Sequence, residues 1–328
     1  MTTIEIRELD PFAPETVAAL LPVFRAGCAV DAPTHPVPSE AFLNFVVGAR
    51  VARRRMCLVA FDGGVPIGYG CQTHDYVTNK DTLFGDLWVL PERRADATGL
   101  LLEAFKAYAR GLGCTKLVNS FTEFARADYE SAFVAGGGRE VSVERRSQID
   151  LRGIDRERYA AWAAPSEKNA HYRIESWSTP TPEHLLPALV QANDAMRDAP
   201  TGDLEFNYPP PDVDRRRKAE ALLTAAGERK HVVAALTGDG EVAGFHELFL
   251  IPGYRMASVG NTAVTAKFRG HGLGLRLKAT MALWLLTAEP RIELVDTWND
   301  VGNHPILRVN EALGYAKAED WGTWQFEL

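Results

Sequence analysis

The chain has 328 residues, of which 46% are hydrophobic and 24% charged, and this composition excludes disordered, collagen-like and coiled-coil proteins. Its 36 Lys and Arg residues against 43 Asp and Glu give a net charge of −7, which does not attract nucleic-acid phosphates, so we expect no nucleic-acid partner. The length is enough for two domains, and no apolar run approaches the roughly 20 residues of a membrane span, so we also expect no membrane contact.

The first half of the chain predicts an ordered series of strands, a turn and a helix. Apolar runs indicate the strands, Asp62-Gly63-Gly64 indicates a hairpin turn, and apolar residues at helical spacing indicate the helix. The predicted elements are strand 56–61, turn 62–64, a return strand from 65, strand 83–90, helix 99–110 and strand 116–121.

The second half repeats this order. Its predicted elements are strand 231–236, turn 238–240, strand 241–251, strand 256–264, helix 274–287 and strand 292–298. Matching elements in the same order indicate a tandem repeat. We therefore predict an α/β (α+β) protein of two domains, 1–155 and 171–328, joined by a linker at 156–170. Each domain is expected to hold a mixed, mostly antiparallel sheet flanked by helices.

The four cysteines lie in the first third of the chain, at positions 28, 57, 71 and 114. They form no CxxC pair, so they predict neither a zinc site nor a disulfide framework, and they favour a reducing compartment. The charged N-terminal segment lacks the apolar run of a signal peptide. We expect a cytoplasmic protein without a bound metal.

A glycine-rich segment joins the strand ending near Val264 to the next helix. Glycines at 270, 272 and 274 allow positive φ and close approach of a ligand, and amide N–H groups at a helix N-terminus favour an anion. Arg269 adds a permanent cation, and together these features suit a pyrophosphate. The alternatives are a turn that merely connects strand and helix, and a dinucleotide site, although the spacing is not G-x-G-x-x-G.

The pattern Arg269-x-x-Gly272-x-Gly274 resembles the acyl-CoA signature of the GCN5-related N-acetyltransferase (GNAT) superfamily. The resemblance covers about residues 172–328 and includes Asn299-x-x-x-Asn303 and the tripeptide Leu313-Gly314-Tyr315. The two-domain layout is similar to that of mycothiol synthase.

The resemblance implies acyl transfer from acetyl-CoA, or another acyl-CoA, to the amine of a small molecule by direct attack, without a metal. It also implies which residues bind the co-substrate, through the pantetheine arm, the pyrophosphate or the following helix. These are Ala263, Val264, Arg269, Gly270, His271, Gly272, Leu273, Gly274, Asn299 and Asn303.

The first half lacks two of the three glycines of this segment and keeps Gly99 at the position of Gly274. Residues 87–99 align without a gap to 262–274, and Ala95, Asp96 and Ala97 stand at the positions of residues 270–272. Because an aspartate repels phosphate at short range, we expect the first domain to be a degenerate, non-catalytic copy. Retained weak CoA binding is the alternative.

For the chemistry, Glu247 is the candidate general base. Strand alternation places it on one face with Phe245 and Phe249, where desolvation would raise its pKa. The alternative is a surface or salt-bridged carboxylate. The resemblance places a tyrosine acid at position 310, but this chain has Asn310, which can offer only a hydrogen bond to the leaving thiolate.

A loop between the first helices of the second half carries Asp198, Asp203 and Glu205, which could receive a cationic amine. The alternative is that these are solvated loop charges. The chain is thus interpreted as an N-acetyltransferase acting as a monomer or homodimer. Its rivals are a non-catalytic acyl-CoA sensor and an aminoacyl-tRNA-dependent transferase of the same tandem layout.

Overall fold

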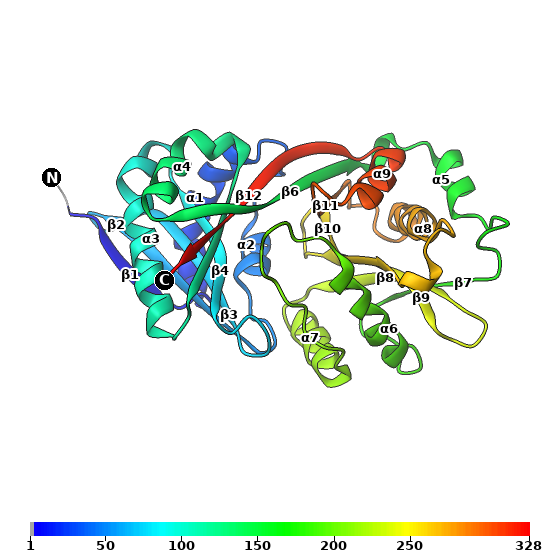
Figure 1. Ribbon diagram of the computed structural model, residues 1–328. Coiled ribbons are helices and arrows are strands. Elements are labelled where there is room, and N and C mark those ends of the chain that lie inside the picture. The colour runs from blue at the N-terminus through cyan, green and yellow to red at the C-terminus, as the bar shows by residue number, and fades with distance from the viewer. Residues whose placement is uncertain (1–2) are drawn as a thin grey trace. The chain divides into compact units, whose positions relative to one another are not determined.

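The computed structural model describes residues 3–328, which form two compact units (Figure 1). The first unit runs to Arg145 and also includes Thr201–Asn207 and Ala318–Leu328. The second unit comprises Arg146–Pro200 and Tyr208–Lys317.

In the first unit a sheet with the strand order β1-β2-β3-β4-β5-β12 has helices on both faces. Neighbouring strands are antiparallel except β4 and β5, which are parallel. One sheet face packs against α3 and α4 through side chains such as Leu101 and Phe133. The elements are β1 (Glu5–Leu9), α1 (Pro14–Asp31), α2 (Glu40–Val47), β2 (Arg53–Asp62), β3 (Val65–Asp75), β4 (Thr82–Val89), α3 (Arg94–Gly111), β5 (Lys116–Thr122), α4 (Arg126–Ala135) and β6 (Gly138–Asp150).

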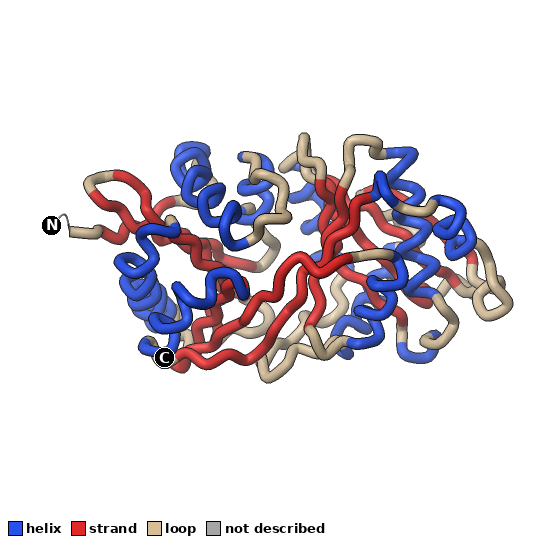
Figure 2. Tube along the Cα trace, turned by 90° about the horizontal axis from the view of Figure 1, so that it is seen from above, coloured by secondary structure: helices blue, strands red, loops and turns tan. Residues whose placement is uncertain are grey.

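The second unit has the strand order β6-β11-β10-β9-β8-β7, in which β10 and β11 are the parallel pair. Helices α6 and α7 lie on one side of strands β8 and β9, and α8 lies on the other (Figures 1 and 2). The elements are α5 (Arg156–Ala163), β7 (Arg173–Ser178), α6 (Leu186–Ala192), α7 (Val213–Ala225), β8 (Arg229–Leu236), β9 (Val242–Leu250), β10 (Met256–Val264), α8 (Leu273–Ala288), β11 (Leu294–Asp300), α9 (His304–Leu313) and β12 (Ala316–Glu327).

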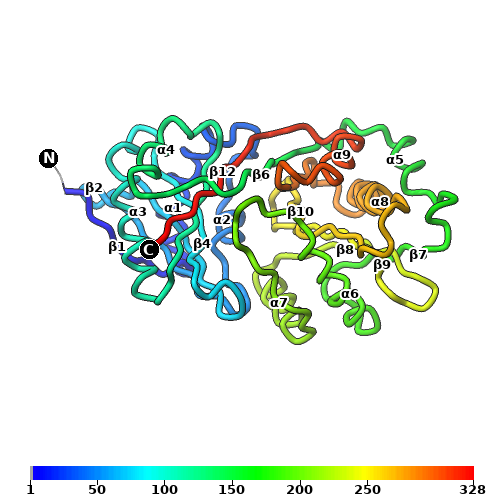
Figure 3. Tube along the Cα trace, viewed as in Figure 1, coloured from blue at the N-terminus to red at the C-terminus, as the bar shows by residue number. Residues whose placement is uncertain are grey.

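The order of elements from β1 to β6 is repeated from β7 to β12, with α5 inserted between the repeats. The predicted α/β fold of two similar domains is confirmed. The segment expected to be a linker contains α5, and the compact units divide inside strand β6, which begins in the first unit and ends in the second. Strand β12 begins in the second unit and ends in the first, where its last residues pair with β5 (Figure 3).

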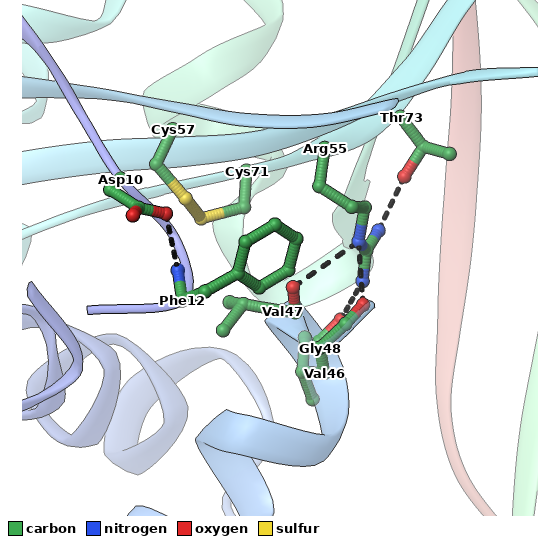
Figure 4. The surroundings of a disulfide bond; sticks show 9 residues. All are labelled: Asp10, Phe12, Val46, Val47, Gly48, Arg55, Cys57, Cys71 and Thr73. Carbon is green, nitrogen blue, oxygen red and sulfur yellow. Dashed lines mark hydrogen bonds between the residues drawn. A yellow bond between two sulfur atoms is a disulfide. The ribbon is translucent and has the colours of Figure 1, made fainter. Parts of the chain in front are cut away.

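The prediction of no disulfide is wrong, because Cys57 and Cys71 are bonded to each other (Figure 4). They lie directly opposite each other on β2 and β3, with Cα atoms 4.2 Å apart. Hairpin register, rather than a Cys-x-x-Cys motif, brings these two side chains together. Cys28 and Cys114 are buried free thiols.

Within residues 3–328, none of the helices has the length and hydrophobicity that crossing a membrane requires. The same part of the chain contains no cluster of His, Cys, Asp and Glu side chains arranged to hold a metal ion.

Candidate functional site

The parallel strands β10 and β11 separate part of the way along their length. Their register runs from Met256 opposite Leu294 to Ser258 opposite Asp296 and ends there, whereas β10 continues to Val264. On its other side β10 stays paired with β9 through Val264, after a bulge that follows Val259. The edge of β10 that faces β11 therefore presents main-chain groups with which another extended chain could pair.

This open edge leads directly into the glycine segment. Gly270 and Gly272 adopt φ values of 85° and 75°, and Gly272 is the N-terminal cap of α8. A Cβ atom at Gly270 would meet nothing within 4 Å, so the backbone borders open space. The first turn of α8 contains no acidic residue, and no side chain caps the helix. The N-terminus of α8 is thus an accessible, positively polarised end of a 16-residue helix.

Arg269 and His271 are both fixed by partners outside the glycine segment. Arg269 donates from Nε to the Val264 carbonyl at 3.1 Å and pairs through Nη2 with Asp198 at 2.6 Å. The His271 carbonyl accepts from Asn169 Nδ2 at 3.1 Å, and its Nδ1 lies 2.6 Å from the Tyr172 hydroxyl. Asn169 and Tyr172 are missed by sequence reasoning, because no motif marks their segment.

The structure brings Asn299 and Asn310 together. Asn310 is buried in α9 and donates from Nδ2 to Asn299 Oδ1 at 2.8 Å, on the part of β11 beyond its pairing with β10. Its Oδ1 accepts from Lys278 Nζ of α8, also at 2.8 Å. Burial lowers the pKa of Lys278 to about 7. Asn303 lies at the start of α9, where its carbonyl accepts from the Leu307 amide.

The expectation of a raised pKa for Glu247 is wrong. The carboxylate is fully buried, accepts from Arg216 Nη2 at 2.6 Å and from Lys230 Nζ at 2.8 Å, and lies under α7. Burial would raise its pKa, but the two cations outweigh burial and lower the pKa to about 2. A carboxylate so firmly held in its charged form is a poor proton acceptor, which favours the salt-bridged alternative. His246 points to the other sheet face, where its Nδ1 lies 2.7 Å from Thr262 Oγ1.

The three acidic residues expected to form one substrate cluster do not belong to one unit. Asp198 lies in the second unit, paired with Arg269. Asp203 and Glu205 belong to the first, where the Asp203 amide donates to the Val141 carbonyl and Glu205 pairs with Lys116 at 2.5 Å.

The corresponding region of the first unit is built differently. Strand β4 pairs with β5 over five residues, as far as Asp86 opposite Ser120. Helix α3 begins at Arg94, so the positions that match the glycines lie inside the helix. Asp96 pairs there with Arg93 at 3.0 Å. Beyond this last pair β4 continues for three residues, to Val89, whereas β10 continues for six residues beyond Ser258, and the matching positions of the first unit hold no left-handed glycine.

The comparisons with known proteins agree with this geometry. Residues 193–315 match the family model described as "Acetyltransferase (GNAT) family". A search of curated proteins finds no match to the chain. Among solved structures, the chain is similar to a tandem GNAT protein from the clavulanic acid biosynthesis pathway, with a TM-score of 0.80 and 24% identity over 99% of this chain and 98% of that one.

Two further structures are similar over almost the whole chain. One is a GCN5-related N-acetyltransferase from Sphaerobacter thermophilus, with a TM-score of 0.66 and 16% identity, covering 99% of this chain and 95% of that one. The other is an acetyltransferase from the GNAT family of Colwellia psychrerythraea, with a TM-score of 0.56 and 14% identity, covering 99% of each chain.

Proposed function

We propose that the protein transfers an acetyl group from acetyl-CoA to the amine of a small molecule, because residues 193–315 match the acetyltransferase (GNAT) family model and the whole chain is similar in fold to a tandem GNAT protein. The observation that carries this proposal is the continuity of the open β10 edge with the glycine segment. The β10 edge offers main-chain hydrogen-bonding groups to the extended arm of the co-substrate. The glycine segment, which follows β10 directly, offers an anion site at the start of α8.

The residues present fit acetyl-CoA. The pantetheine arm contains amide groups that pair with a strand edge, as an added strand does. The pyrophosphate suits the N–H groups at the start of α8, where Gly270 leaves open space and Arg269 adds positive charge. This proposal assigns the cofactor contacts to residues 263, 264, 269–274, 299 and 303.

When bound, acetyl-CoA supplies an activated acyl group on a leaving thiol. The acceptor must reach the carbonyl as a neutral amine, and we assign the stabilisation of the developing oxyanion to a main-chain N–H of β10. With Glu247 held by two cations, we assign the amine proton to water. Asn310 offers the thiolate a hydrogen bond at most.

A matched pair of glycine variants tests the proposal. Gly270→Val and Gly64→Val both place a β-branched residue at φ 85° where a Cβ meets nothing within 4 Å, so their backbone strain is comparable. Only Gly270 borders the proposed pyrophosphate site. We expect Gly270→Val to abolish thiol release from acetyl-CoA in the presence of a panel of small amines, and Gly64→Val to retain it.

Two outcomes contradict the proposal. An equal loss of thiol release in both variants would show that backbone strain causes the loss, and not a blocked pyrophosphate site. Wild-type protein that binds acetyl-CoA but releases no thiol with any amine would favour the sensor alternative.

A further inference from the structure

Lys278 is a buried amine on helix α8. Its residue is 3% exposed, and within residues 3–328 it forms no ion pair with a carboxylate. Its contacts are the hydrogen bond to Asn310 Oδ1 and the Tyr315 ring, whose centroid lies 5.1 Å from Nζ. Burial of a cation without a counter-ion is costly, so packing alone does not account for this lysine.

The hydrogen bond from Lys278 fixes the orientation of the Asn310 amide. An ammonium group only donates, so Oδ1 must face Lys278 and Nδ2 must face Asn299. Asn299 stands on β11 beyond the last pair with β10. A chain of two hydrogen bonds therefore connects a buried cation to the wall of the strand opening. Nδ2 keeps a second N–H, for which the described residues supply no acceptor.

We propose that Lys278 is a positioning residue that stabilises the leaving thiolate through the Asn310 amide. The inference rests on the proposed acetyl transfer. In that step the amine nitrogen forms the C–N bond, the C–S bond breaks and its electron pair stays on sulfur. The amine proton passes to water, and water protonates the thiolate. Lys278 keeps its proton throughout and acts by charge.

Other titratable side chains lie around Lys278. His246 faces it from β9, and burial lowers the pKa of this imidazole well below its usual range. Tyr315 follows α9, and burial raises the pKa of its phenol. Asp296 on β11 lies near Tyr315 and 3.7 Å from Arg146 of β6. Because burial lowers the pKa of Lys278 to about 7, its charge is present below that pH and is lost above it.

The test measures the thiol pKa of CoA bound to the full-length protein, by the ultraviolet absorbance of the thiolate. Free thiols titrate near ~8.5, and we expect bound CoA to titrate near or below 7 in wild-type protein, in the range where Lys278 carries its charge. Lys278→Met removes the charge but keeps a long apolar side chain, and it should return the thiol pKa to that of the free thiol or above. Lys106→Met, which removes a buried lysine of the first unit, should behave as wild type.

Turnover supplies a second readout. Below neutral pH, Lys278→Met should lose roughly 10- to 100-fold in kcat, the effect of one hydrogen bond to a charged group, with the KM for acetyl-CoA unchanged. Wild-type turnover should fall as pH rises through about 7. The variant should lack that fall, because methionine does not titrate.

An unchanged thiol pKa in Lys278→Met that binds CoA would overturn this inference and leave the proposed function intact. If Lys278→Met does not fold, Asn310→Ala interrupts the same path with Lys278 in place, and an unchanged thiol pKa there would overturn it equally. Wild-type protein that does not bind CoA would overturn the proposed function itself.

Discussion

Glu247 and Lys278 show how the surroundings of a buried charge decide what it can do. Glu247 is held by Arg216 and Lys230, and its pKa falls to about 2. Lys278 contacts an amide oxygen and an aromatic ring, and burial lowers its pKa to about 7. The first is locked in its charged form, whereas the second changes charge near neutrality. The side chain suited to pH-dependent chemistry is therefore the lysine.

We expect the main effect of Glu247→Gln to be a lower free energy of unfolding, and not a lower turnover number. At neutral pH we expect a loss of about 3–5 kcal/mol in the free energy of unfolding, because two buried cations lose their counter-ion. Since the pKa of Glu247 is lowered on folding, its stabilisation is present above its usual value of 4.5 and is lost as pH falls toward 2. Urea denaturation at neutral and acidic pH measures both effects, and the gap between variant and wild type should narrow in acid.

Glu183→Gln is the control, because this carboxylate is 86% exposed in its pair with Arg217 and should contribute little. A Glu247→Gln variant with wild-type stability and a turnover lowered by ~10² or more would contradict our assignment and restore Glu247 as the general base.

Strand alternation predicted the face that Glu247 shares with Phe245, but it could not reveal the partners. Arg216 comes from α7 and lies 31 residues before Glu247 in the sequence, and Lys230 comes from β8. The alternation of residues along one strand indicates which side chains are buried. It does not indicate which charged side chains from other elements pack against them. For the same reason the sequence does not distinguish Lys278 from the other residues of the predicted helix 274–287.

At the scale of elements, the order of strands and helices was predictable, and the helix starts were less so. Helix α3 begins at Arg94 rather than at the expected Gly99, because Ala95, Asp96 and Ala97 continue a helix where glycines would interrupt it. In the second unit Gly270 and Gly272 hold the backbone at positive φ and delay the start of α8. The same alignment positions thus form helix in one unit and a glycine segment with positive φ values in the other.

The glycine segment also depends on the stretch before β7. Asn169→Ala removes the hydrogen bond to the His271 carbonyl and the contact of its Oδ1 with Arg276. We expect acetyl-CoA affinity to fall about 10-fold, the effect of one or two hydrogen bonds that hold the segment in place. Isothermal titration calorimetry measures the affinity.

Asn207→Ala is the matched control, because the hydrogen bonds of Asn207 with Asn79 are made by its main chain. Its affinity should equal that of wild type. An unchanged affinity in Asn169→Ala would show that the glycine segment needs no support from this stretch.

At the scale of the whole molecule, the tandem repeat was evident from the order of elements, but the limits of the units were not. Strands β6 and β12 each begin in one unit and end in the other, and Thr201–Asn207 returns to the first unit. The crossings in β6 and β12 fall within continuous strands, where no turn residue marks them. The disulfide of Cys57 and Cys71 was likewise hidden, since only the register of β2 and β3 places the two residues opposite each other.

The central claim is that one of two similar units binds the co-substrate. In the second unit the parallel strands separate after Ser258 and the glycines leave the start of α8 open. In the first unit the strands stay paired to Asp86 and helix α3 fills the corresponding positions. The stoichiometry of CoA binding, measured by calorimetric titration of the full-length protein, tests this claim most directly. We predict one CoA per chain, lost in Gly270→Val and kept in Gly64→Val. Two CoA molecules per chain, or one that survives Gly270→Val, would contradict it.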